Sequence, residues 1–274
     1  MIGFIRMVSF AGLLGLAAVH GGDGPGIWRK LDEGLYVGEF DAPQKSHRGD
    51  SRITVVRVDP EHFAFRVLSA VREDSVRRTV KEWCERHELV GAINAGMYAK
   101  DYLTHVGYMK NDGRVLNPSV RKDYRAAFVC DPDTTGIASA ALVDFECRDF
   151  AAVDRRYRTV VQNLRMISCK RTNVWSRRKR RWSTAALGAD DDGFLLFVFC
   201  QSPYSVHDLN DMLLELPINL SNAMYLEGGA PASFYLSHNG TTIERYGFFE
   251  TDGKEGGGLV IEHRLPNVIG FTPR

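Results

Sequence analysis

The segment Phe194–Cys200 (FLLFVFC) is apolar at every position. A strand with one solvated face alternates apolar and polar residues, whereas a strand that is covered on both faces is apolar throughout. We therefore expect Phe194–Cys200 to be a central strand of the core. This restricts the fold to a sheet with other elements packed on both of its sides.

Two amphipathic helices are predicted. One spans Ser205–Leu216, with Ser205 as its N-cap and Pro217 directly beyond its end. Its apolar residues follow helical spacing: Leu209, Met212, Leu213 and Leu216. The other helix spans Ser75–His87, with Ser75 as its N-cap.

The remaining periodicity is of the strand type. Arg52–Val58 and His62–Ser69 flank the turn Asp59-Pro60, which predicts a hairpin. Further short strands are expected at Leu89–Ile93, Ala223–Leu226, Phe234–Leu236, Thr242–Phe248 and Leu259–Glu262. Many strands, few helices and no long linker predict an α+β fold. We expect a single domain over residues 28–274, with a mixed, strand-rich sheet core and a few packed helices.

The first residues form an apolar block of their own. Arg6 precedes the apolar run Met7–Val19, which is shorter than the roughly 20 residues needed to cross a bilayer. The pattern is typical of a secretory signal peptide over residues 1–21, and a buried N-terminal helix is the alternative. We expect an exported, periplasmic or extracellular protein with no stable membrane anchor after signal cleavage.

The charge balance is close to neutral, with 35 Lys and Arg against 34 Asp and Glu. This argues against a globally basic nucleic-acid binder, and no nucleic-acid partner is predicted. The basic loop, residues 170–181, nevertheless concentrates cations beside Trp175 and Trp182. We expect it to be an exposed hairpin tip. A solvated loop is the simpler interpretation, and binding of an anionic glycan, lipid headgroups or nucleic acid is the alternative.

Cysteine and acidic residues give little support for a metal site. None of the five cysteines stands in a C-x-x-C pair, so a structural zinc site is not indicated. Cys130 and Cys147 are a candidate disulfide pair in an oxidising compartment. Asp190–Gly193 is expected to be a hairpin turn, because the later ligands of an EF-hand are missing. No cofactor and no metal-ligating residues are predicted, and the sequence leaves a divalent metal open.

Two apolar strands each end in a polar residue that is soon followed by glycine. The first is Asn94-Ala95-Gly96 and the second is Glu227-Gly228-Gly229. Strand ends meet the loops that usually carry binding groups, and glycine lets a ligand approach the backbone. Asn94 offers a donor and an acceptor, and Glu227 can serve as acid or base. The alternative is that both are turn residues. A lone histidine nearby, His105, is more often structural than catalytic.

Five segments of the chain occur in the order of a known family pattern. They are Asn94–Met97, a segment from Gly107 onward, Gly188–Cys200, Ser205–Leu216 and Glu227–Gly229. Together they resemble the phosphodiester glycosidase family, and in particular its exported bacterial branch, over about residues 50–265. Two positions depart from that pattern: Glu227 stands where characterised members carry Asp, and Thr184 stands where they carry Arg.

The resemblance implies that Asn94 and Glu227 converge on one pocket. Asn94 and Glu227 are then the expected catalytic residues, with His105 as a second candidate proton donor. Arg165 is a candidate phosphate partner through its planar guanidinium. The expected substrate-binding residues are Arg165, Gln162, Thr184, Gly96, Gly228 and Gly229.

The predicted function is an exported hydrolase of glycosyl phosphodiesters or related envelope glycans. Its expected partner is a carbohydrate or glycosyl-phosphate substrate. The alternative is a non-catalytic envelope protein that binds glycan or anionic polymer through the same pocket.

Overall fold

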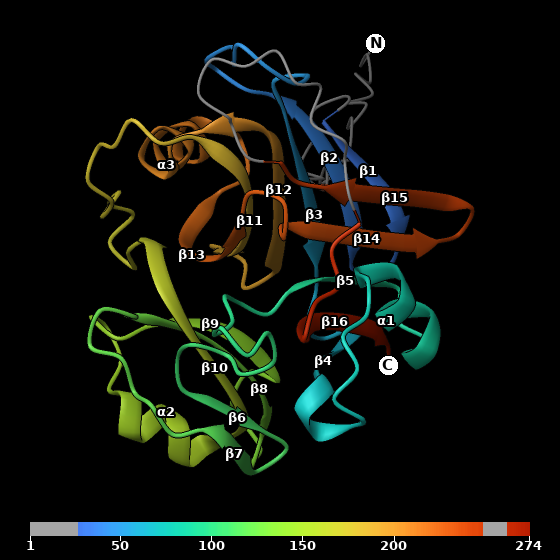
Figure 1. Cartoon of the computed structure of the whole chain (residues 1–274), viewed down its shortest axis with the longest axis vertical. Helices are drawn as coiled ribbons and strands as arrows, with labels where there is room; N and C mark the ends of the chain where they lie inside the picture. The colour runs from blue at the N-terminus through green and yellow to red at the C-terminus, as the bar shows by residue number, and fades with distance from the viewer. Residues whose placement is uncertain (1–26, 249–261) are drawn as a thin grey trace, which may run out of the picture.

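The computed structural model describes residues 27–248 and 262–274. Over these residues the chain forms two antiparallel sheets and three α-helices (Figure 1). The expected strand-rich core with a few helices is confirmed. The expected mixed sheet core differs from the structure: every strand pair in the described part is antiparallel, and the strands divide between two sheets. The predicted signal peptide and nearly all of the predicted strand Leu259–Glu262 lie outside the described residues.

The larger sheet has eleven strands. Nine of them follow the order β1-β2-β3-β12-β11-β13-β10-β6-β7. The other two form a branch, in which β8 pairs with β10 and β9 pairs with β8. Its strands are β1 Trp28–Asp32, β2 Leu35–Asp41, β3 Arg52–Val58, β6 Met109–Asn111, β7 Arg114–Asn117, β8 Ala126–Pro132, β9 Ala140–Asp144, β10 Tyr157–Ile167, β11 Trp182–Asp190, β12 Leu195–Tyr204 and β13 Leu220–Gly228.

The predicted central strand is confirmed as β12, which lies between β3 and β11. Its apolar residues are buried, and they alternate between two hydrophobic clusters on opposite faces of the sheet. The predicted turn at Asp190–Gly193 joins β11 to β12. There the Asp190 carboxylate accepts the backbone N–H groups of Asp192 and Phe194, at 3.0 and 2.9 Å.

The smaller sheet has five strands in the order β15-β14-β5-β16-β4. They are β4 Phe63–Ser69, β5 Gly91–Asn94, β14 Ser233–His238, β15 Thr241–Tyr246 and β16 Asn267–Pro273. The two sheets share one hydrophobic core, in which Phe65 of β4 stacks on Phe197 of β12 with ring centroids 6.2 Å apart.

The predicted hairpin between Arg52–Val58 and His62–Ser69 is wrong. Both segments are strands, but β3 belongs to the larger sheet and β4 to the smaller. The reason lies in the edges of β3: one is occupied by β2 and the other by β12. The chain therefore crosses from one sheet to the other at Asp59-Pro60, and β4 pairs with β16.

The helix predicted after β12 is confirmed as α3 Val206–Glu215, which packs on the outer face of β11, β12 and β13 (Figure 1). Ser205 caps it by accepting the Asp208 N–H at 3.1 Å.

The other predicted helix begins later than expected, as α1 Val80–His87. Ser75 is not its cap, because its φ of 59° is in the left-handed region. Thr79 caps α1 in a reciprocal pair with Glu82. A third helix, α2 Phe150–Arg156, was not predicted.

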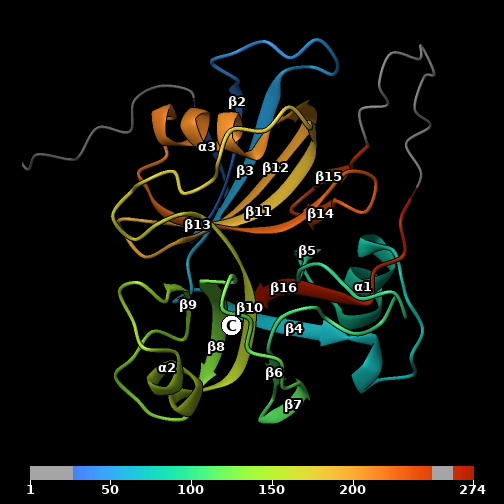
Figure 2. The ribbon, with the colours of Figure 1, turned by 60° about the vertical axis from the view of Figure 1, so that its left-hand side comes forward.

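Strand β10 connects the two halves of the larger sheet (Figure 2). Its C-terminal half pairs with β13, and its N-terminal half pairs with β8 and β6. Because β13 lies between β10 and β11, the basic loop that joins these strands crosses over β13. The predicted hairpin tip at residues 170–181 is therefore wrong, although the cations of this loop are exposed as expected.

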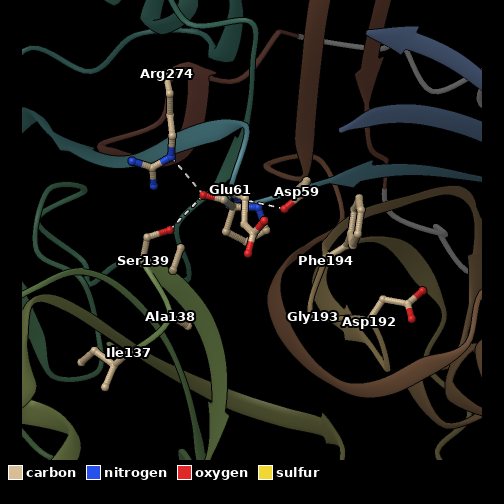
Figure 3. Close-up of a pocket in the computed structure, with 11 residues that line it drawn as sticks. Asp59, Glu61, Ile137, Ala138, Ser139, Asp192, Gly193, Phe194 and Arg274 are labelled. Atoms are coloured by element: carbon tan, nitrogen blue, oxygen red, sulfur yellow. Dashed lines mark hydrogen bonds between the residues drawn. The ribbon is translucent and has the colours of Figure 1, made fainter. Parts of the chain in front are cut away.

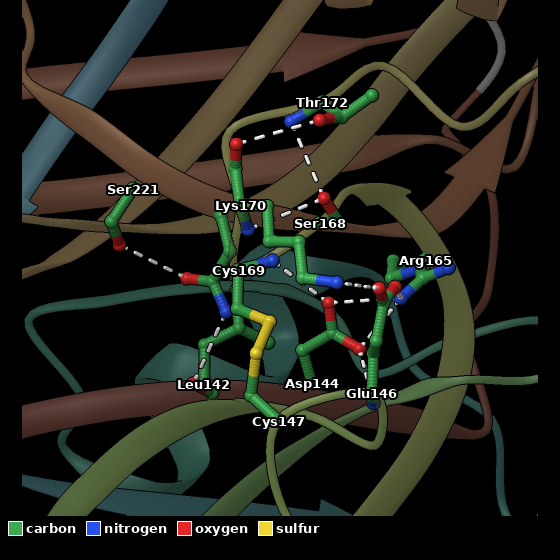
Figure 4. The surroundings of a disulfide bond; sticks show 11 residues. Leu142, Asp144, Glu146, Cys147, Arg165, Ser168, Cys169, Lys170, Thr172 and Ser221 are labelled. Carbon is green, nitrogen blue, oxygen red and sulfur yellow. Dashed lines mark hydrogen bonds and ion pairs between the residues drawn. A yellow bond between two sulfur atoms is a disulfide. The ribbon is translucent and has the colours of Figure 1, made fainter.

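The disulfide joins Cys147, in the segment after β9, to Cys169, just after β10 (Figure 4). The predicted pair of Cys130 with Cys147 is wrong. Cys130 is a free, buried residue of β8, where it contributes to the core between the sheets. In the described part of the chain, none of the helices has the length and apolarity needed to cross a membrane.

Candidate functional site

The two strand ends singled out in the sequence lie next to each other, although they belong to different sheets. Asn94 ends β5, and its Nδ2 donates to the carbonyl oxygen of Pro231 at 3.0 Å. The backbone N–H of Ser233 donates to Asn94 Oδ1 at 2.8 Å. Asn94 is buried, and its amide holds the segment that directly follows Glu227-Gly228-Gly229. These two bonds place the end of β5 against residues 231–233, a few positions after Glu227 in the chain.

Glu227 is a buried carboxyl group that has no cationic partner among the described residues. Its side chain accepts one hydrogen bond, from the Gly228 N–H at 2.9 Å. Burial raises the pKa of Glu227 to about 7, and the Gly228 hydrogen bond opposes this shift. A carboxyl group with such a pKa exchanges protons readily near neutral pH, which suits a general acid or base.

The charge of Glu227 acts on three tyrosines. Burial, with a smaller contribution from the charge of Glu227, raises the pKa of Tyr98 to about 12. The pKa values of Tyr225 and Tyr124 are also raised, chiefly by burial, and the Glu227 charge again contributes. These phenols were not predicted as site residues. Their only sequence signal is that Tyr98 and Tyr225 stand close in the chain to Asn94 and Glu227.

Glycine is required at two positions of the site. Gly96 has a φ of 146°, and a Cβ atom there would overlap Asn163 Oδ1 and His105 Cε1. A Cβ atom on Gly228 would overlap the Tyr225 hydroxyl and the Trp182 indole. Both backbones therefore lie directly against side chains of the protein, which fill the space left by the missing Cβ atoms.

Several buried polar atoms at this site lack a hydrogen-bond partner within the described residues. They are Nδ1 of His105, Oδ1 of Asn163 and Oγ1 of Thr184. His105 and Asn163 meet at Gly96, and Thr184 of β11 pairs with Gly228 of β13. Buried polar atoms are nearly always satisfied, so unpartnered ones indicate a site for water or a polar ligand.

The placement of His105 does not suit a proton donor. Burial lowers its pKa to about 4, so the ring is neutral at pH 7. Its Nε2 lies 2.8 Å from the Gln162 carbonyl oxygen and must carry the proton to donate there. The remaining ring nitrogen, Nδ1, is therefore an acceptor.

The side chain of Gln162 stabilises the turn that contains Tyr124 through four hydrogen bonds. Its Oε1 accepts the N–H groups of Tyr108 and Arg121, at 3.1 and 3.0 Å. Its Nε2 donates to the carbonyl oxygens of Arg121 and Tyr124, at 2.8 and 2.7 Å. With all of these bonds made, Gln162 has no free group for a substrate.

Arg165 lies in an ion-pair cluster next to the disulfide (Figure 4). Its Nη1 is 2.9 Å from Asp144 Oδ1 and 2.6 Å from Glu146 Oε2. The backbone N–H of Cys169 also donates to Asp144, at 2.8 Å. Two carboxylates thus compensate the charge of Arg165, and the structure shows no contact between Arg165 and Glu227.

A cavity of about 730 Å³ lies elsewhere (Figure 3). It lies between the β3–β4 turn, the β8–β9 loop and the β11–β12 turn, where Ser139 and Arg274 both donate to the Pro60 carbonyl oxygen. None of the predicted site residues lines it. Across residues 27–248 and 262–274, His, Cys, Asp and Glu side chains form no group of three that is placed to hold a metal ion.

The fold resembles several solved structures at low sequence identity. The catalytic domain of zebrafish N-acetylglucosamine-1-phosphodiester alpha-N-acetylglucosaminidase, auto-inhibited by its pro-peptide, superposes with a TM-score of 0.61 and 13% identity, over 88% of this chain and 82% of that one. A hypothetical protein from Synechocystis gives 0.62 and 12%, over 92% and 64%. A Burkholderia pseudomallei protein described as exported gives 0.53 and 10%, over 81% and 74%. These likenesses define the class of fold.

Sequence comparison identifies the family. A search of curated proteins gave no match. The family model of the phosphodiester glycosidases, however, matches residues 87–272, which include both strand ends and most of both sheets. The chain belongs to the phosphodiester glycosidase family.

Proposed function

We propose that this protein is an exported hydrolase that cleaves glycosyl phosphodiesters or related envelope glycans. The observation that carries the proposal is Glu227, a buried carboxyl group with no cationic partner in the described structure and a pKa of about 7. It stands at a strand end of a phosphodiester glycosidase fold. A buried carboxyl group of this kind is costly for stability, so its presence favours a catalytic role.

Glu227 acts as the general base in this proposal. Phosphate is a good leaving group, so the bond between the sugar C1 and the phosphate oxygen can break with little help from an acid. The more demanding step is activation of the attacking water. Deprotonated Glu227 takes a proton from that water while the water oxygen bonds to C1, and the phosphate leaves with the electron pair of the broken bond.

The other residues of the site position the reacting groups. Asn94 acts through the segment after Gly229, which it holds by two hydrogen bonds. His105 Nδ1, Asn163 Oδ1 and Thr184 Oγ1 offer acceptors for sugar hydroxyl groups. Gly96 and Gly228 let the side chains of the site, among them His105 and Asn163, approach the backbone closely.

Gln162 and Arg165 act indirectly. Gln162 fixes the turn that holds Tyr124. Arg165 ties β10 to the segment after β9 through Asp144 and Glu146.

Export is supported by the disulfide. Cys147 and Cys169 form a bridge, and disulfides persist mainly in oxidising compartments. The signal-like pattern of residues 1–21 agrees with this. The extent of the domain is supported by pairing on the N-terminal side of the family match: β3 pairs with β12, and β4 pairs with β16. We therefore assign residues 28–274 to one phosphodiester glycosidase-like domain.

The test is hydrolysis of the methyl diester of N-acetylglucosamine 1-phosphate by the purified protein. This substrate is chosen because the zebrafish relative is named for that bond. Glu227→Gln should lower kcat about 10³-fold, within the usual range for a general base. Glu215→Gln, on the exposed side of α3, is the matched control and should leave kcat unchanged. Full activity of Glu227→Gln contradicts the assigned mechanism. Binding of the diester by the wild-type protein without turnover selects the non-catalytic alternative.

The pH profile gives the direction of proton transfer. A base must be deprotonated, so kcat/KM of the wild-type protein should rise as pH increases from 6 to 8, with its midpoint set by the Glu227 pKa of about 7. A profile that falls over this interval would assign Glu227 as the acid instead.

A further inference from the structure

A second cavity, of about 350 Å³, lies beneath the basic loop. Its lining includes Asp123, Arg125, Leu164, Arg165, Trp175 and Arg178. We call it the Trp175 cavity. It combines an aromatic side chain with three guanidinium groups, and neither Glu227 nor Asn94 lines it.

The Trp175 cavity is connected to the surroundings of Glu227 through two tyrosines, Tyr225 and Tyr124. Trp175 packs on Tyr225 with ring centroids 5.4 Å apart, and Leu164 pairs with Tyr225 between β10 and β13. The second tyrosine, Tyr124, stands in the chain between Asp123 and Arg125, which both line the cavity. The charge of Glu227 contributes to the raised pKa of both tyrosines. The two tyrosines therefore link the surroundings of Glu227 to the residues that line the cavity.

The charge in the Trp175 cavity is uncompensated and positive. Arg165 is paired with Asp144 and Glu146, and Asp123 is paired with Arg121 at 3.0 Å. Arg125 and Arg178 are both exposed, and neither has a carboxylate partner among the described residues.

The aromatic side chain of the cavity is held in place. Trp175 Nε1 donates to the Arg165 carbonyl oxygen at 2.6 Å, which fixes the orientation of the indole. A fixed aromatic face beside free guanidinium groups suits an anionic ligand whose carbon skeleton packs on the ring.

The proposed reaction needs such a site. A phosphodiester is anionic, deprotonated Glu227 repels it, and Thr184 brings no cation to β11. Arg165 is already occupied by two carboxylates. Some other positive group must therefore hold the phosphate side of the substrate.

We propose that the Trp175 cavity binds the leaving-group side of the substrate as a phosphate-linked polyol chain, with Arg125 and Arg178 on phosphate groups and Trp175 against the polyol. This rests on the proposed function, and it names the substrate class as a glycosyl phosphodiester that continues into an anionic polyol phosphate.

The first experiment measures binding without catalysis. A poly(glycerol phosphate) oligomer without sugar is titrated into the full chain by calorimetry, at 50 and 300 mM NaCl. The wild-type protein should bind it, and more weakly at the higher salt concentration. The double variant Arg125→Gln/Arg178→Gln should bind at least about tenfold more weakly.

The matched control removes the same charge from the same loop outside the cavity. Arg177→Gln/Arg180→Gln should bind like the wild-type protein, because neither residue lines the cavity. Equal weakening of both double variants would show general electrostatic attraction and overturn the proposal. Equal binding of uncharged polyglycerol, or tighter binding of a DNA oligonucleotide, would also overturn it.

The second experiment separates this proposal from the proposed hydrolysis. With a diester of N-acetylglucosamine 1-phosphate that carries a glycerol phosphate chain, Arg125→Gln/Arg178→Gln should raise KM about tenfold and leave kcat unchanged. With the methyl diester, which offers only the scissile phosphate, the same variant should raise KM less than it does with the chain-bearing diester. Binding of the sugar-free oligomer does not depend on turnover, so the first experiment stays decisive even if the protein hydrolyses neither diester.

Discussion

Glu227 and the carboxylates around Arg165 differ in how their negative charge is compensated. Glu227 has one backbone hydrogen bond and no cation in the described structure, and burial raises its pKa to about 7. In the cluster, hydrogen bonds from Lys170 and then Arg165 lower the pKa of Glu146 to about 2. Asp144 beside it is buried, accepts two charge-assisted bonds from Arg165, and lies next to a disulfide.

The contrast separates a reactive group from a structural one. A carboxylate that is saturated by cations holds its charge at all ordinary pH values and cannot exchange protons at pH 7. A buried carboxyl group without a cation destabilises the fold but titrates near neutral pH. If this interpretation is correct, changes in the cluster should lower stability, and changes at Glu227 should lower activity while raising stability.

The largest effect on stability is expected from Asp144→Ala. The change leaves Arg165 with one partner and removes the acceptor of the Cys169 N–H. Breaking a buried ion pair from one side costs about 3–5 kcal/mol, so the free energy of unfolding in urea should fall by that order. Asp133→Ala, at an exposed position, is the control. A loss as small as that of the control would mean that the ion pair is not structural.

Loss of the disulfide should cost slightly less. Cys147 and Cys169 close a loop with a sequence separation of 22 residues. Chain entropy for a loop of this length corresponds to about 3 kcal/mol. The variant Cys147→Ser/Cys169→Ser should lose that stability, and so should the wild-type protein under a reducing agent. The variant itself should not respond to the reducing agent, and a response would implicate the buried thiols instead.

Glu227→Gln should change stability in the opposite direction and only at high pH. The pKa of Glu227 is raised in the folded state, so the folded protein binds the proton more tightly than the unfolded chain. This contribution is present below about pH 4.5 and is lost as pH rises through about 7. The variant should therefore be about 2–3 kcal/mol more stable than the wild-type protein at pH 8, and close to it at pH 4. Urea titrations at both values measure this, and equal differences at both would exclude titration of Glu227 as the cause.

The smallest effect is expected from Lys170→Gln. Lys170 is largely exposed, and its ion pair with Glu146, at 2.6 Å, is open to solvent. Such pairs contribute little, so the unfolding midpoint in urea should stay unchanged within error. A clear loss would show that the cluster depends on its exposed member as well as on Arg165.

The sequence predicts those parts of the fold that depend on local signals. Phe194–Cys200, the turn at Asp190–Gly193 and the helix α3 are recognisable because burial, turn chemistry and capping are all encoded within a few residues. The pairing of β4 and the partner of Cys147 depend on segments far away in the chain, and no local signal encodes them.

The candidate site shows the same division. The glycine-flanked strand ends at Asn94 and Glu227 predict a pocket, and Asn94 bonds to Pro231 and Ser233, which follow Glu227 closely in the chain. The tyrosines around Glu227 could not be recognised, because tyrosine is common in ordinary cores. The compensation of Arg165 by Asp144 was also invisible, since it requires the placement of β9 against β10 that only the sheet provides.

The order of strands in the smaller sheet has a consequence for biosynthesis. β4 and β5 are synthesised before β16, yet both pair with it. Ser69 of β4 can pair only once Asn267 has been synthesised, and Ile93 of β5 pairs in the same way with Ile269. Until β16 is synthesised, their hydrogen-bonding edges stay open and the shared core lacks one wall. Folding of the smaller sheet therefore depends on the synthesis of β16, and a ribosome that stalls before β16 holds a nascent chain that chaperones must protect.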